Sequence, residues 1–347
     1  MKISLPSWCH HPLLLNMKSR ILLYFLYKKC TTIAVAVVIL LSLYFSLANL
    51  AGVYNGLVVS SDSLDDSRNL RESIDDDLKP IVSFANLSWT ESSIIFNRIE
   101  RTGSRTLIRV MERLGKKYNF STIASDDWAL KYMDIEDQKA FVHDVNKQAT
   151  PFVYERSVHY VHFPRFGSKQ PSWISLIRDP LRRIISLYYF KRYGDIGTRP
   201  NASDTSSKPS FDDCVLKNQP ECSLKNVFRV IPFFCGQSAG CRVPNKWALE
   251  TAKKNVLENF KLVGVLEELN TTFQVLEALI PQYFHGASRV YKAIVSSGVV
   301  DQFKSFPGDP PSEQALTKMK GRLALEYEFY EFVKERLGTL KQQMEIE

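Results

Sequence analysis

An uncharged, apolar segment near the beginning of the sequence constrains the fold most strongly. No Asp, Glu, Lys or Arg occurs between Cys30 and Ser61, and residues 31–50 are mostly apolar. About 20 apolar residues are needed to span the ~30 Å hydrocarbon core of a bilayer, and the apolar region of a cleaved signal peptide is shorter. We therefore expect a transmembrane signal anchor over residues 30–53, in preference to a buried core helix.

The charges on the two sides of this segment differ in sign. Residues 1–29 carry five basic residues and no acidic one, whereas residues 62–79 carry seven acidic and three basic residues. Basic residues concentrate on the cytosolic side of a membrane span, which predicts a single-pass, type II orientation. We expect a cytosolic tail over residues 1–29, a polar lumenal stem over 54–90 and a folded lumenal domain over 91–347.

Sequons and cysteines beyond the expected anchor fit the lumen of the secretory pathway. The sequons, each a predicted glycosylation site, begin at Asn86, Asn119, Asn201 and Asn270. The four cysteines are Cys214, Cys222, Cys235 and Cys241. Four cysteines allow three connectivities, and pairing by proximity would join Cys214 to Cys222 and Cys235 to Cys241. A zinc site is the alternative, but it is disfavoured because no Cys-x-x-Cys pair occurs.

Strand-like and helix-like segments alternate through residues 91–347, and the apolar fraction of 45% can fill a sizeable core. Strands are predicted over 93–98, 151–159, 171–178 and 261–266. Helices are predicted over 104–117, 180–192, 246–260, 267–279 and 312–343. This alternation favours an α/β fold with a mostly parallel sheet. The net charge of +8 suits a polyanionic partner, although an ordinary solvated surface gives the same balance.

The first predicted strand and helix are joined by a short loop of residues 101–106. Gly103 permits close approach to the backbone, Ser104 and Thr106 supply hydroxyls, and the N–H groups of a helix start attract anions. The loop lacks the G-x-x-x-x-G-K-[ST] spacing, so a nucleotide-hydrolysing P-loop is disfavoured. An ordinary turn and helix cap is the alternative interpretation.

A second strand–helix junction offers another phosphate contact. Arg178 ends a predicted strand, and Ser186 follows two helical turns later. An arginine makes paired, charge-assisted contacts with phosphate. Two such sites on adjacent strand–helix units fit a doubly phosphorylated nucleotide. 3′,5′-Adenosine diphosphate is one, and it is the leaving group of the sulfuryl donor 3′-phosphoadenylyl sulfate (PAPS).

The sequence resembles the uronosyl 2-O-sulfotransferases of the Golgi, which include heparan sulfate 2-O-sulfotransferase, uronyl 2-sulfotransferase and Pipe-like proteins. The resemblance covers about residues 93–340 and is closest to the uronyl and Pipe branch. The matching strings are Asn97-Arg98-Ile99, Gly103-Ser104-Arg105-Thr106, Val158-His159-Tyr160, Ile177-Arg178-Asp179-Pro180, Ile231-Pro232-Phe233-Phe234-Cys235-Gly236-Gln237, Trp247-Ala248-Leu249, Val263-Gly264-Val265 and Glu326-Tyr327-Glu328-Phe329-Tyr330.

The resemblance implies a P-loop-like sulfotransferase fold, with a mostly parallel sheet flanked by helices and preceded by one transmembrane helix. It also implies both disulfides named above and transfer of a sulfuryl group from PAPS to the 2-hydroxyl of a hexuronic acid. The expected acceptor is a glycosaminoglycan or a glycoprotein glycan, with no metal and no nucleic acid involved. The expected location is the Golgi membrane, as a homo-oligomer such as a trimer.

Roles for individual residues follow from the same resemblance. The residues expected to line the 5′-phosphosulfate are Arg101, Thr102, Gly103, Ser104, Arg105 and Thr106. Arg178 and Ser186 are expected to hold the 3′-phosphate, and Arg98 to meet the acceptor uronate. Arg165 and Arg192 are further candidates for binding acceptor anions.

The sequence departs from the family at two catalytic positions. Arg101 stands where the family usually has lysine, so it can stabilise the bridging oxygen electrostatically but cannot donate a proton. Ser157 aligns with the catalytic histidine of the heparan enzyme. His159 would lie on the same face of a regular strand, and we expect it to be the general base, with a core role as the alternative. His162 is a weaker candidate because it would face the opposite side.

A third departure concerns residues 296–308, where the family is basic and this sequence has only Lys304 as a base. We therefore expect this segment to close over the donor weakly or in a different way. Ser157 and Arg101 leave a second function open, that of a catalytically silent glycan-binding protein of the same fold.

Overall fold

The computed structural model describes residues 92–125, 132–196, 209–305 and 308–346. The predicted tail, anchor and stem lie outside these residues, as do the sequons at Asn86 and Asn201. Within the described ranges, no helix has the length and apolarity needed to cross a bilayer. The sequon at Asn119 lies at the exposed end of a helix, and that at Asn270 lies half-buried in the first turn of another.

A five-stranded parallel sheet organises the described chain, in the order β2-β3-β1-β4-β5. The strands are β1 (Ser93–Asn97), β2 (Ser121–Ala124), β3 (Phe152–Arg156), β4 (Ser172–Ile177) and β5 (Phe260–Val265). Every residue of β4 and all but the first residue of β1 are buried. A parallel sheet needs cover on both faces, which explains these continuous apolar runs.

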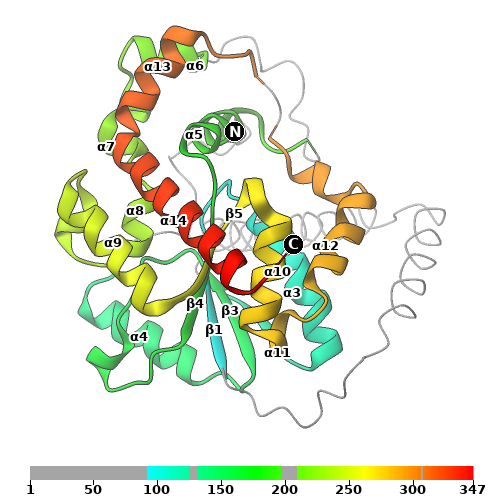
Figure 1. Ribbon diagram of the computed structural model, residues 1–347. Coiled ribbons are helices and arrows are strands. Elements are labelled where there is room, and N and C mark those ends of the chain that lie inside the picture. The colour runs from blue at the N-terminus through cyan, green and yellow to red at the C-terminus, as the bar shows by residue number, and fades with distance from the viewer. Residues whose placement is uncertain (1–91, 126–131, 197–208, 306–307, 347) are drawn as a thin grey trace, which may run out of the picture. The chain divides into compact units, whose positions relative to one another are not determined.

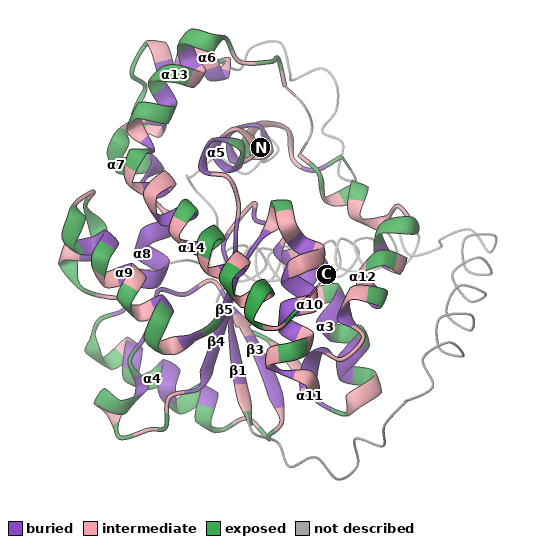
Figure 2. Cartoon of the chain, in the orientation of Figure 1, coloured by how far each residue is buried: buried purple, intermediate pink, exposed green. Residues whose placement is uncertain are grey.

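Helices cover both faces of the sheet (Figure 1). They are α3 (Ser104–Tyr118), α4 (Ile135–Asn146), α5 (Pro180–Tyr193), α6 (Phe211–Leu216), α7 (Leu224–Val227), α8 (Val230–Cys235), α9 (Lys246–Asn259), α10 (Leu269–Leu279), α11 (Pro281–Phe284), α12 (Ala287–Ser296), α13 (Glu313–Arg322) and α14 (Ala324–Gln343). Helices α3, α10, α11 and α12 pack together on one side, and α4, α8 and α9 lie on the other. Figure 2 shows the buried strands between the exposed outer faces of these helices.

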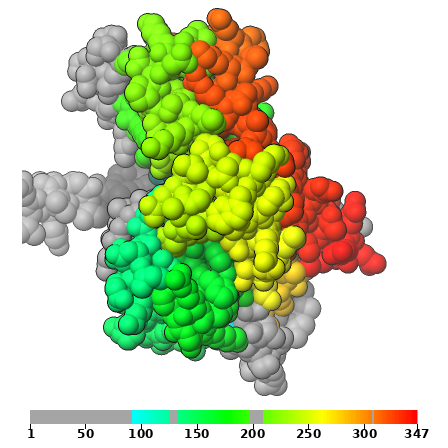
Figure 3. Space-filling view, turned by 90° about the vertical axis from the view of Figure 1, so that its left-hand side faces the viewer, coloured from blue at the N-terminus to red at the C-terminus, as the bar shows by residue number. Residues whose placement is uncertain are grey.

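The predicted C-terminal helix over residues 312–343 is wrong in one respect, because it is two helices that meet at Leu323. Helix α13 packs on α6 through Ala315 and Met319, in a small apolar cluster separate from the main core. Helix α14 packs on β5 and α9 through Phe329 and Val333, which belong to the main core. Because α13 and α14 pack against two separate apolar clusters, the chain changes direction between them at Leu323. Figure 3 shows the segments of the two helices beside different neighbours.

The predicted strand over residues 151–159 is also too long. The strand β3 ends at Arg156. Beyond it, the N–H of Tyr160 donates to the carbonyl of Phe233 in α8, at 2.8 Å, instead of to a neighbouring strand. Asn97 Nδ2, at the end of β1, donates to the same carbonyl at 3.2 Å. Residues 157–159 therefore leave the sheet, and the strand alternation used to orient His159 does not apply.

Both predicted disulfides are confirmed. Cys214 is joined to Cys222, and Cys235 to Cys241. These four sulfur atoms are therefore not zinc ligands. The first bridge ties α6 to the following turn, and the second closes the loop after α8, next to the extended segment that carries His159.

Candidate functional site

The two loops predicted to bind phosphate begin at neighbouring strands in the middle of the sheet. From β1 the chain crosses to β2 and β3 on one side, whereas from β4 it continues to β5 on the other. In an open parallel sheet, such a reversal leaves a crevice at the carboxyl ends of the two strands, and ligands bind there. The strand order therefore places both loops at the expected binding position.

The loop after β1 is held in an unusual backbone conformation. Gly103 has φ 84° and precedes α3, and no described side chain caps that helix. A Cβ at Gly103 would lie 2.5 Å from Leu266 Cδ1, so that side chain would have to shift, and the positive φ would strain any other residue at this position. Arg101 has φ 65°, a left-handed conformation that is costly for a non-glycine residue and is concentrated at functional sites. The loop thus turns the start of α3, where N–H groups attract anions, toward the crevice.

A cavity of about 620 Å³ lies at this edge and is lined by residues from both loops. Seven of the eight predicted donor-binding residues line it, namely Arg101, Gly103, Ser104, Arg105, Thr106, Arg178 and Ser186. The eighth, Thr102, is buried and donates its hydroxyl to the carbonyl of Ile99 at 2.9 Å. Thr102 therefore stabilises the loop from within and is not one of the residues that line the cavity.

Arg101 lies at the centre of the contacts around the cavity. Its Nε donates to Ser186 Oγ at 3.1 Å, and its Nη1 lies 3.0 Å from Asp195 Oδ1. Asp195 Oδ2 also pairs with Arg105 Nη2 at 2.7 Å. Burial lowers the pKa of Arg101, and the hydrogen bond and charge of Asp195 oppose that shift, so the guanidinium keeps its charge. The buried carboxylate of Asp195 therefore forms ion pairs with both arginines of the first loop, Arg101 and Arg105.

The sequence analysis did not identify Asp195 as a site residue. The sequence offers no local signal, because Asp195 and Arg101 are 94 residues apart and meet only through the tertiary fold. The segment from Phe303 to Ser305 was also undervalued. Arg101 Nη2 donates to Ser305 Oγ at 2.6 Å and to the carbonyl of Phe303 at 3.2 Å.

This segment, residues 303–305, forms one wall of the cavity. Ser305 forms an antiparallel bridge with Asp195, and its Oγ lies 2.7 Å from that of Ser186. The Phe303 ring lies under the guanidinium of Arg105, 4.7 Å from its centroid. The wall thus consists of Phe303, Lys304 and Ser305, and its closure over a donor stays a prediction.

Arg178 joins the two loops. Its Nη1 donates to the carbonyl of Arg101 at 3.3 Å, and its Nε lies 4.0 Å from Glu267 Oε1. Burial lowers the pKa of Arg178, while Glu267 raises it. This arginine supports the left-handed turn of the first loop and presents a positive charge to the cavity.

Besides Thr102, four predicted catalytic or acceptor-binding residues are not among those that line the cavity. Arg98 pairs with Glu155 at 3.6 Å, and Arg165 is exposed in a turn. Arg192 pairs with Glu221 at 2.8 Å and lies over the Tyr188 ring, which gives it a place in the packing of α5. Their contacts with an acceptor stay predictions.

His159, the fourth, is 3% exposed. Its ring stacks on Tyr132 at 4.2 Å and lies against Phe233 at 5.2 Å. This environment corresponds to the core role that the sequence analysis kept as the alternative. Catalysis by His159 stays a prediction.

The comparisons with known proteins agree with one another. The model of the sulfotransferase family matches residues 89–333. Uronyl 2-sulfotransferase from Homo sapiens is 36% identical over 257 residues, which cover 72% of this chain and 63% of that protein. Heparan sulfate 2-O-sulfotransferase 1 from Homo sapiens is 34% identical over 257 residues, covering 72% of this chain and 71% of that protein. The chain therefore spans less than two thirds of the uronyl relative.

A solved structure, that of the mouse sulfotransferase SULT7A1 complexed with PAP, covers 80% of this chain and 94% of its own, at 14% identity and a TM-score of 0.34. That likeness is too low for a comparison of sites. The family match extends from before β1 into α14 and so includes both loops and the cavity between them. By this match and by its relatives, the chain belongs to the sulfotransferase family.

Proposed function

We propose that this protein transfers a sulfuryl group from PAPS to the 2-hydroxyl of a hexuronic acid in a glycosaminoglycan or a related glycan. The observation that carries the proposal is the cavity between the loops after β1 and β4, where four arginines, Lys304, several hydroxyls and the start of α3 converge. The names of the two human relatives supply the reaction class and the uronic acid acceptor.

The cavity fits the demands of sulfuryl transfer. Negative charge develops on the leaving phosphate, and fixed cations that face it lower the barrier without reorganising. Arg101 and Arg105 are already held in place by Asp195. Arg178, directly after β4, and Ser186, on α5, would hold the other phosphate of the donor. Positioning and electrostatics therefore account for most of the expected catalysis, as in phosphoryl transfer.

A second function is favoured by a specific observation. Ser157 donates its hydroxyl to the carbonyl of Arg98 at 2.9 Å and cannot replace an imidazole as a base. Arg101 has hydrogen-bonding partners on all three guanidinium nitrogens. A catalytically silent protein that binds nucleotide and anionic glycan would show the same features.

Radiolabelled sulfate transfer separates the two functions. The full 347-residue chain, purified in detergent, is given labelled PAPS with desulfated heparan, dermatan or chondroitin chains, and 3′,5′-adenosine diphosphate binding is measured by calorimetry. The enzyme labels at least one polymer, and disaccharide analysis locates the label on O2 of the uronic acid. Nucleotide binding without transfer to any polymer supports the silent protein, and absence of nucleotide binding contradicts both.

We further propose a Golgi location with the folded domain in the lumen, on the strength of the apolar segment, its flanking charges and the sequons. In sealed Golgi vesicles, the domain would be protected from added protease and its glycans would be sensitive to glycosidase after detergent. Cross-linking in the membrane would test the proposed homo-oligomer.

A further inference from the structure

Sulfuryl transfer to a hydroxyl requires a general base that takes the hydroxyl proton. Three side chains near the end of β3 are candidates for this base. Ser157 is a poor base because its hydroxyl holds its own proton at neutral pH. His159 lies beyond the strand, buried between Tyr132 and Phe233. The third side chain is that of Glu155, which the sequence analysis did not consider.

Glu155 lies at the carboxyl edge of the sheet, next to the start of the first loop. Its Oε2 lies 3.6 Å from Nη1 of Arg98, which directly follows β1. Arg98 is close enough to Arg105, a residue that lines the cavity, for the two positive charges to repel. The carboxylate therefore lies beside the arginine predicted to meet the acceptor uronate.

The environment of Glu155 suits a base. Its register partners, Phe96 in β1 and Ala124 in β2, carry no charge. The side chain is 12% exposed, and its Oε2 is buried and accepts no hydrogen bond from any residue that the structure describes. Burial raises the pKa of Glu155, Arg98 lowers it and Glu112 on α3 raises it. A carboxylate with one buried oxygen that accepts no hydrogen bond holds a transferred proton more readily than one in water.

We propose that Glu155 is the general base of the sulfuryl transfer, an inference that rests on the proposed function. As the acceptor oxygen attacks sulfur, its proton passes to the Glu155 carboxylate and a new S–O bond forms. The S–O bond to the 5′-phosphate breaks, and its electron pair leaves with 3′,5′-adenosine diphosphate. Glu155 then returns its proton to water. Arg98 keeps the carboxylate ionised until the acceptor arrives and binds the uronate beside it.

Glu155→Gln in the full chain tests this role, because glutamine keeps the size of the side chain and removes its basicity. Transfer to the labelled polymer identified above is measured from pH 5 to 9. We expect kcat to fall about 100-fold or more, the usual contribution of a general base. The KM for the polymer and the affinity for 3′,5′-adenosine diphosphate should change less than about threefold. The acid limb of the wild-type kcat/KM profile, where activity rises as Glu155 loses its proton, should disappear.

Glu112→Gln is the matched control. Glu112 is an exposed carboxylate on α3 that raises the pKa of Glu155, whereas the side chain of Glu155 is only 12% exposed. This variant should keep kcat within about twofold and move the acid limb to lower pH. Glu155→Asp should retain the acid limb and part of the rate, since it keeps a carboxylate.

The outcomes separate the inference from the proposed function. If the wild type transfers sulfate and Glu155→Gln keeps its kcat and acid limb, the inference is overturned and the function stands. Loss of both in His159→Ala, with both kept in Glu155→Gln, would assign the base to His159 instead. Nucleotide binding with no transfer by the wild type overturns the function and the inference together.

Discussion

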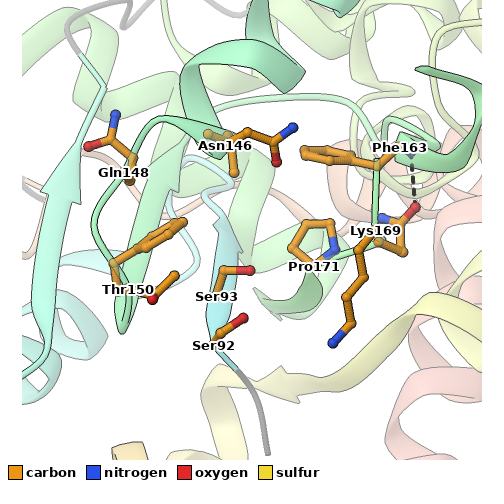
Figure 4. Close-up of a pocket in the computed structure, with 11 residues that line it drawn as sticks. Ser92, Ser93, Asn146, Gln148, Thr150, Phe163, Lys169 and Pro171 are labelled. Atoms are coloured by element: carbon orange, nitrogen blue, oxygen red, sulfur yellow. Dashed lines mark hydrogen bonds between the residues drawn. The ribbon is translucent and has the colours of Figure 1, made fainter. Parts of the chain in front are cut away.

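The two ends of the sheet carry cavities of different character. The carboxyl end has the cavity of about 620 Å³, which is lined by four arginines, Lys304 and several hydroxyl-bearing residues, and Arg101 in that lining is paired with Asp195. The amino end has a smaller one, of about 160 Å³, lined mainly by neutral polar groups such as Ser93, Asn146 and Thr150 (Figure 4). Lys169 is its only charged lining residue among those that the structure describes.

The difference follows from the chain direction. Where β1 and β4 end, the chain enters the start of a helix, so positive helix ends and loop side chains collect at the carboxyl edge. At the amino edge, α4 ends near the cavity and loops lead into the strands. A cavity alone is therefore weak evidence of function, and the convergence of charge and helix starts distinguishes the site.

The largest predicted effect concerns the support of the carboxyl end. Glu326 on α14 is buried, accepts hydrogen bonds from the N–H groups of Arg229, Val230 and Ile231, and faces the fully buried Arg183 of α5. Glu326→Ala leaves that guanidinium without its carboxylate, and we expect the free energy of unfolding to fall by about 3–5 kcal/mol. Denaturant titration measures it. Lys169→Ala at the amino end should change the free energy of unfolding by less than about 0.5 kcal/mol. Equal losses in the two variants would contradict the difference between the two ends of the sheet.

The next effect is on nucleotide affinity. Arg101→Ala removes a buried cation that can make charge-assisted hydrogen bonds, each worth about 1.5–3 kcal/mol, so the Kd for 3′,5′-adenosine diphosphate should rise about 100-fold. Calorimetry on Arg101→Ala and Lys169→Ala measures the contrast. An unchanged Kd in Arg101→Ala, or a weakened one in Lys169→Ala, would place the nucleotide elsewhere.

Asp195→Asn should act in the opposite direction. It removes the carboxylate that holds Arg101 and Arg105, so both cations become available to phosphate, and we expect affinity for the nucleotide to rise about tenfold. The ligand-free protein should melt at a lower temperature because two partly buried cations lose their partner. Weaker binding in this variant would mean that Asp195 positions the arginines in the bound state as well.

Ser186→Ala has the smallest expected effect. It deletes one uncharged hydroxyl that contacts Arg101 and Ser305 and leaves every charge of the site in place, so we expect a loss of about 1 kcal/mol. The Kd should rise about fivefold. An increase as large as that of Arg101→Ala would show that the hydroxyl, rather than the charge, organises the second phosphate contact.

Features with a local cause could be predicted from the sequence. Gly103 before an amphipathic helix predicts the first loop, and short separations predict both disulfides. Features with a distant cause could not. Asp195 and Ser305 reach Arg101 from segments 94 and 204 residues away, and no spacing rule links them.

Two further discrepancies have physical reasons. The strand β2 has only four residues and a half-exposed pattern, so it lacks the apolar run that marked the other strands. The residues after Arg156 resemble a strand in sequence. The hydrogen bond from the N–H of Tyr160 to the carbonyl of Phe233 shows that they have left the sheet. Glu155 was overlooked for a related reason, since a charged residue inside a strand indicates an exposed position unless the fold covers it.

The aspartate that holds two arginines has a consequence for selectivity. Because an internal anion already neutralises part of the cavity, an incoming ligand exchanges with it instead of meeting bare cations. Chloride and other monovalent ions gain little from that exchange, whereas a ligand with several charges outcompetes the carboxylate. The affinity for nucleotide should therefore fall less steeply with ionic strength than the number of arginines suggests. Small monovalent anions should bind the cavity only weakly.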